Sequence, residues 1–113
     1  MPNTKAYKIL GQALPAAGAL SSLYEAPVGK QVVCSTLVVC NQNNGQPAAF
    51  RIAVIPAGQS VSRASYLFYD ELIDINKSRL ITIGITLQPG DAIKVFASIP
   101  DLSFNVFGSE FAV

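Results

Sequence analysis

Carboxylates are the first residues to consider for chemistry, and three of them cluster between Tyr69 and Asp74. Paired carboxylates can hydrolyse a glycosidic bond or bind calcium. Asp70 and Glu71 are adjacent, so in an extended segment their side chains point to opposite faces and are poorly placed to share a substrate. We therefore interpret the cluster of Asp70, Glu71 and Asp74 as solvated residues at the end of a strand.

The chain has no histidine. This removes Ser-His-Asp and Cys-His catalysis, the usual general base near neutral pH, and a nitrogen ligand for zinc. An acid-pair enzyme would need two of Asp70, Asp74 and Asp91 within roughly 5–10 Å of each other. An enzyme of this kind is the last of our hypotheses. We expect a protein that is not an enzyme, with no catalytic residues, no metal and no cofactor.

The two cysteines, Cys34 and Cys40, lie in one apparent strand. At ~3.3 Å per residue their Cα atoms would be ~20 Å apart, whereas a disulfide needs roughly 4.4–6.8 Å. Their even spacing places both side chains on one face, where we expect them to act as small buried hydrophobic groups. Reduced thiols fit assembly in a cytoplasm.

Aromatic and basic residues are the remaining candidates for ligand binding. Tyr66, Phe68 and Tyr69 could stack on sugars or bases, although Tyr66 and Phe68 share a face and fit a core or a subunit interface better. Basic residues are spread evenly and the net charge is +1, so we expect no nucleic-acid partner.

Period-two hydrophobic alternation recurs along the chain, with turn residues between the alternating segments. It predicts an all-β fold: a two-sheet antiparallel β-sandwich, jelly-roll-like or immunoglobulin-like, with about eight strands. We expect one domain over residues 1–113, with a short N-terminal arm over residues 1–5. No apolar run approaches a membrane span and no secretory signal is evident, so we expect no membrane partner. The predicted strands are Ala6–Leu10, Leu20–Ala26, Val32–Asn41, Ala48–Ile55, Ser65–Ile73, Arg79–Leu87, Ala92–Ile99 and Ser103–Gly108.

The outer faces of several predicted strands are themselves apolar. In one strand Phe96 shares a face with Lys94, and in another Ile55 shares a face with Arg51. Only 13% of residues are charged, about half the usual share, so we expect a neighbouring subunit to cover much of the surface. The candidate interface residues are Lys5, Tyr7, Leu14, Leu20, Phe96 and Phe111.

Five segments carry a resemblance to a known class of protein. They are Tyr7–Gln12, Leu23–Pro27, Ser35–Asn41, Phe50–Val54 and Ser103–Glu110. Together they resemble small β-domain virion structural proteins of tailed bacteriophages. The resemblance implies a capsid decoration (cement) protein that binds the major capsid protein or other virion proteins. It also implies assembly in the host bacterial cytoplasm and location in the virion, and we expect a homo-oligomer, with a trimer favoured.

Two alternatives stay open. One is a tail, baseplate or neck attachment protein of the virion. The other is a module that binds polysaccharide on a host surface. The second would show solvent-exposed aromatic side chains with polar partners in a groove, and Tyr66 and Tyr69 are its test positions.

Overall fold

The computed structural model describes residues 6–113, which form eight strands and one short 3-10 helix. No helix in these residues is long and apolar enough to cross a membrane. In chain order the elements are β1 (Ala6–Ala13), β2 (Ser21–Glu25), β3 (Lys30–Asn41), β4 (Ala48–Ile55), η1 (Arg63–Ser65), β5 (Tyr66–Ile73), β6 (Ser78–Leu87), β7 (Ala92–Ala97) and β8 (Leu102–Ala112).

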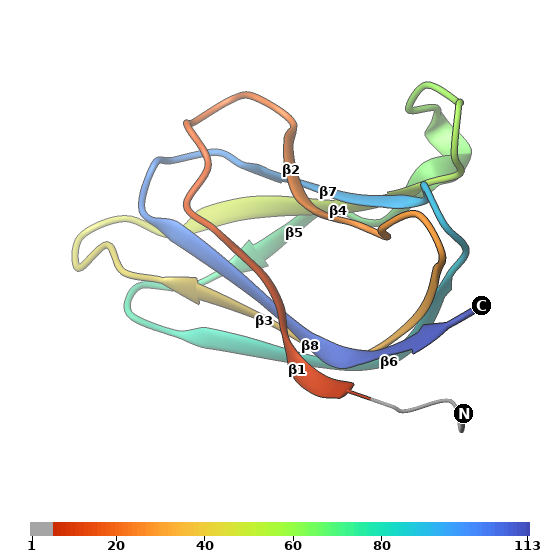
Figure 1. The fold of residues 1–113 in the computed structure, drawn as a ribbon. Coiled ribbons are helices and arrows are strands. Elements are labelled where there is room, and N and C mark those ends of the chain that lie inside the picture. The colour runs from red at the N-terminus through yellow and green to blue at the C-terminus, as the bar shows by residue number, and fades with distance from the viewer. Residues whose placement is uncertain (1–5) are drawn as a thin grey trace.

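The strands form two antiparallel sheets that face each other as two layers (Figure 1). One sheet has the order β1-β8-β3-β6 and the other the order β2-β7-β4-β5. The chain passes from one sheet to the other at every connection except that between β4 and β5, which pair directly. This eight-stranded crossing pattern is that of a jelly roll, so the structure decides between the two sandwich types that the sequence left open.

The core lies between the two sheets and is built from the inward residues of both. Phe50 of β4 and Phe104 of β8 are fully buried, and their ring centroids lie 6.2 Å apart at an interplanar angle of 73°. An edge-to-face pair of this kind adds a specific attraction to the burial of two large side chains. It joins the two sheets across the core.

Two strands continue past their predicted C-terminal ends, because a glycine there allows close backbone packing and does not form a turn. β1 continues from Leu10 to Ala13 through a register shift at Leu10, and a Cβ on Gly11 would collide with the backbone oxygen of Leu23. β8 runs past Gly108, where a Cβ would collide with the backbone oxygen of Val33. The prediction that the first strand ends at Leu10 was therefore wrong.

The expectation that both cysteines share a buried face was also wrong. The register of β3 shifts between Cys34 and Thr36, so the side chains after this β-bulge point to the opposite side from the one that simple alternation gives. Cys34 is buried at 1% exposure, whereas Cys40 is half-buried on the outer side of the strand. Both thiols are free, as expected.

Candidate protein-binding surface

The outer face of the β1-β8-β3-β6 sheet carries no charged residue at the outward positions of its described strands. The four charged residues of these strands are Lys8, Lys30, Arg79 and Glu110, and each alternates with the outward residues. The other outward positions hold mainly Ser, Thr, Asn and Gln. We call this surface the neutral sheet face; its large apolar residues are Tyr7, Ile9, Val33, Val38, Leu80, Phe107 and Phe111.

The apolar residues of the neutral sheet face are accessible to a partner. Tyr7 is 75% exposed, Ile9 55% and Leu80 69%. A protein that works alone in water rarely leaves large apolar side chains together on a face without charges. This face therefore has the composition of a protein contact surface.

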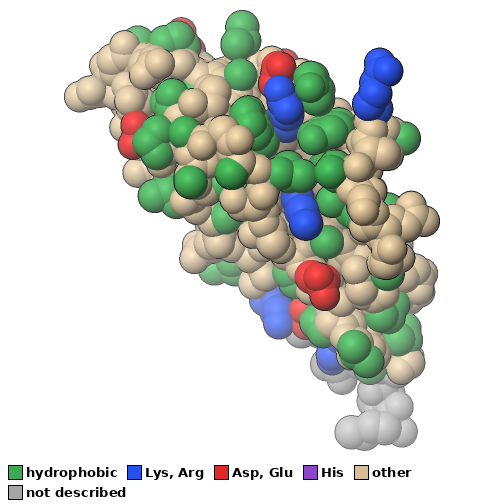
Figure 2. Space-filling view, turned by 90° about the horizontal axis from the view of Figure 1, so that it is seen from above, with side chains coloured by type: hydrophobic (Ala, Val, Ile, Leu, Met, Phe, Trp, Pro, Cys, Tyr) green, Lys and Arg blue, Asp and Glu red, His purple; other side chains and the backbone are tan. Residues whose placement is uncertain are grey.

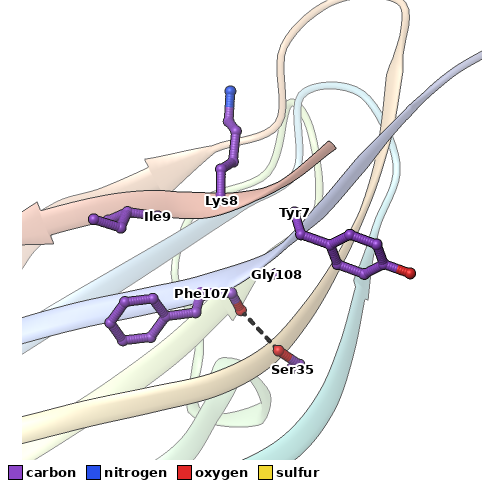
Figure 3. Close-up of a pocket in the computed structure, with 6 residues that line it drawn as sticks. All are labelled: Tyr7, Lys8, Ile9, Ser35, Phe107 and Gly108. Atoms are coloured by element: carbon purple, nitrogen blue, oxygen red, sulfur yellow. Dashed lines mark hydrogen bonds between the residues drawn. The ribbon is translucent and has the colours of Figure 1, made fainter. Parts of the chain in front are cut away.

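A shallow pocket of about 360 Å³ marks the β1 side of this face (Figure 3). Ser35, the bulged residue of β3, donates its hydroxyl hydrogen to the carbonyl oxygen of Phe107 at 3.3 Å. Tyr7, Ile9 and Phe107 line the pocket. Lys8 also borders it, but its side chain points away from Phe107 and Tyr7. The bulge thus shapes a depression between apolar side chains, and the nearest charge is directed elsewhere.

Lys8 turns toward a buried carboxylate. Its Nζ lies 3.0 Å from Oε1 of Glu110, and the Tyr24 hydroxyl donates a hydrogen bond to Oε2 at 2.6 Å. The hydrogen bond from Tyr24 and the charge of Lys8 lower the pKa of Glu110 despite its burial. Burial and the neighbouring carboxylate raise the pKa of Tyr24. This cluster links β1 and β8 to β2 of the opposite sheet and withdraws two charges from the neutral sheet face.

The outer face of the β2-β7-β4-β5 sheet is different, because charged side chains lie among its apolar side chains (Figure 2). Arg51 Nε lies 2.7 Å from Oδ1 of Asp70, and Nη2 lies 3.3 Å from Oδ2. The Arg51 guanidinium also lies 4.1 Å from the ring centroid of Tyr69 and 4.3 Å from that of Phe96. The hydrogen bonds to Asp70 raise the pKa of Arg51 further. The two outer faces of the sandwich are therefore chemically distinct.

The structure brings only part of the predicted interface set onto one face: Tyr7 and Phe111 share the outer side of the β1-β8-β3-β6 sheet, and the other described residues lie elsewhere. Tyr7 lies on the neutral sheet face, Leu14 is 62% exposed in the loop after β1, and Leu20 is half-buried just before β2. Phe96 packs under Arg51 on the opposite sheet, and Phe111 is half-buried near the end of β8, on the neutral sheet face with Tyr7. Lys5 and the predicted arm over residues 1–5 lie outside the described residues.

The predicted interface residues did not include five residues of the neutral sheet face, which are Ile9, Val33, Val38, Leu80 and Phe107. The signal for Leu80 was present, because it shares its side of β6 with Thr82 and lies opposite Ile81, which is buried at 8% exposure. Phe107 was harder to place, because only the pairing of β8 between β1 and β3 shows which side of that strand faces outward.

Each acidic residue considered for catalysis has its own structural partner. Asp70 pairs with Arg51, and Asp74 Oδ1 accepts the adjacent backbone N–H of Ile75 at 2.8 Å. Asp91 accepts backbone N–H groups of two other residues at 2.8 and 2.9 Å and so stabilises turns. Glu71 lies 3.6 Å from Nη1 of a β6 arginine.

Comparisons with known proteins identify the fold. No family profile and no curated protein sequence matches this chain. A chain of the T13 infectious bursal disease virus particle matches with a TM-score of 0.56 at 10% identity, covering 96% of this chain and 30% of that chain. A chain of the Gx strain of the same virus matches with a TM-score of 0.54 at 14% identity, covering 98% and 33%.

The present chain thus spans about a third of the length of the viral chains that it matches. At these identities the likeness concerns the fold alone. Both neighbours come from viral structures, which agrees with the class of protein that the sequence resembles. Neither comes from a tailed bacteriophage, so that narrower assignment stays a prediction.

Proposed function

We propose that this chain is a virion structural protein, a capsid decoration (cement) protein that acts by contacting other virion proteins and not by catalysis. The observation that carries the proposal is the neutral sheet face, with Ile9 and Leu80 more than half exposed and no charge at the outward positions of its described strands. The fold shared with chains of a viral particle supports the same role.

The partner in this proposal is the major capsid protein. A sheet face without charges at its outward positions can dock on a shell surface without the cost of removing water from unpaired ions. Assembly takes place in the host bacterial cytoplasm, where the two thiols stay reduced. The protein carries out no reaction and needs no cofactor.

A homotrimer is the proposed working form. Three copies on a threefold axis would bind several shell subunits at once, so that individually weak contacts add up to stable attachment. Light scattering on the purified protein measures this directly. A trimeric mass supports the proposal, and a monomer at micromolar concentration contradicts the trimer.

Binding to empty heads assembled without the protein tests the role itself. Wild-type protein is expected to bind saturably, and Ile9→Lys is expected to bind at least about a hundredfold more weakly, because an unpaired ammonium would be buried at the contact. The matched control is Leu72→Lys, which introduces the same charge at a residue of β5 that is 70% exposed. Failure of the wild-type protein to bind heads, together with binding to tails or baseplates, would replace decoration with tail attachment.

A further inference from the structure

A second pocket lies away from the neutral sheet face, where the loop before β5 meets that strand. It has a volume of about 440 Å³ and is lined by Arg63, Tyr66 and Tyr69. Tyr69 is 60% exposed, and its ring meets that of Tyr66 edge to face with centroids 5.0 Å apart. Two aromatic rings and a guanidinium therefore border one open cavity.

The Tyr69 ring of the pocket is held in place by Arg51. Arg51 packs against the Tyr69 ring at 4.1 Å and is fixed by its two hydrogen bonds to Asp70. Asp70 adopts a left-handed backbone conformation with φ of 54°, which aspartate tolerates better than most residues, and this places its carboxylate beside Arg51. A ring that is already positioned loses little freedom when a ligand binds.

The cation of the pocket is positioned by a short turn. Arg63 starts η1, where the backbone N–H of Ser62 donates to Oγ of Ser65 at 3.0 Å and the N–H of Ser65 donates to the carbonyl oxygen of Ser62 at 3.0 Å. The ion pairs within residues 6–113 use Lys8, Arg51 and Arg79, and none includes Arg63. Arg63 is exposed and available to an anion from outside the chain.

We infer that this pocket binds an acidic saccharide, with Arg63 holding the carboxylate and the tyrosines contacting the sugar ring. A planar guanidinium matches a carboxylate with two parallel hydrogen bonds. The apolar face of a pyranose packs on an aromatic ring, while the phenol hydroxyls can exchange hydrogen bonds with its hydroxyl groups. The Arg51–Asp70 pair balances its own charge, so the pocket has one uncompensated positive charge. Binding of an acidic saccharide in this pocket is separate from attachment to a capsid. It would let the protein bind a surface that carries acidic glycans.

Titrations followed by nuclear magnetic resonance of the backbone amides test this inference. The ligands are a galacturonic acid trisaccharide, the neutral trisaccharide maltotriose, and inorganic phosphate. The acidic trisaccharide is expected to shift the amide signals around Arg63, Tyr66 and Tyr69 saturably, and the other two ligands are expected to cause little change. The expected loss in Arg63→Gln is about tenfold or more in affinity, since a charge-assisted contact is removed.

The control variant is Lys77→Gln, which removes an equal charge from an exposed turn outside the pocket and should bind as the wild type does. Because Arg63 is exposed, its variant should keep the wild-type spectrum elsewhere. Equal shifts with maltotriose would overturn the role of the charge, and equal shifts with phosphate would reduce the pocket to a simple anion site. No saturable shift with the acidic trisaccharide would overturn the inference, whatever the result of head binding.

Discussion

Replacing Tyr24 by Phe removes one hydroxyl from the buried cluster that joins the two sheets. Tyr24 is 9% exposed and Glu110 8% exposed, and their hydrogen bond measures 2.6 Å. A hydrogen bond to a charged group contributes about 1.5–3 kcal/mol, and phenylalanine keeps the ring, so no cavity forms. Lys8 does not make up the loss, because its side chain is 48% exposed and its ion pair is weakened by solvent. We expect the free energy of unfolding to fall by about 1.5–3 kcal/mol.

Urea unfolding at pH 7, followed by circular dichroism at a fixed protein concentration, measures this change. The matched control is Tyr69→Phe, which keeps the contact between the ring and Arg51 at a position that is 60% exposed. The control should change the free energy of unfolding by less than about 0.5 kcal/mol. Equal effects of the two substitutions would refute the reasoning, because Tyr24 would then contribute only as a ring in the core.

Three further predictions follow from the same structure. Folding lowers the pKa of Glu110, so the stabilisation that Glu110 provides is fully present above its unfolded pKa of about 4.3 and is lost as the pH falls through its folded pKa. The difference in the free energy of unfolding between wild type and Glu110→Gln, measured with urea, should therefore shrink over this acidic range. Folding raises the pKa of Tyr24, so the stabilisation that Tyr24 provides is present below pH ~10 and is lost as the pH rises through the raised pKa. The free energy of unfolding of Tyr24→Phe should not show this alkaline loss. Burial raises the pKa of Cys34 to about 11, so a thiol reagent at pH 8 should react with Cys40 first. Cys40→Ser should abolish the fast phase of the labelling reaction followed by absorbance. A fast phase that persists in this variant would contradict the exposure of Cys40.

The sequence predicted much of the fold because alternation is a local signal. The strand Ala48–Ile55 matched the prediction residue for residue, since Phe50 and Ile52 alternate with Arg51 between clear turns. The pairing order of the strands is not local, and either sandwich type satisfies the same alternation. Only the three-dimensional structure shows that β8 lies between β1 and β3, and this order distinguishes a jelly roll from an immunoglobulin-like sandwich.

Bulges and close backbone contacts account for the predictions that failed. A bulge changes the direction of every later side chain in its strand, and nothing in the residue types around Ser35 announces it. Gly11 resembles a turn residue in sequence, yet its place in the fold is set by the backbone of β2. The candidate surface was predicted only in part for the same reason. Its apolar residues were visible one strand at a time, but their common face depends on the register of four strands.

The central claim is that the neutral sheet face is covered in the assembled particle. Cysteine labelling tests it most directly, with Leu80→Cys on the neutral sheet face and Leu72→Cys on the other sheet, each in a Cys40→Ser background. Leu80 is 69% exposed and Leu72 70% exposed, so a maleimide should label both variants equally in solution. On particles, we predict that labelling at position 80 is lost while labelling at position 72 persists. Equal labelling of both positions on particles would contradict the account.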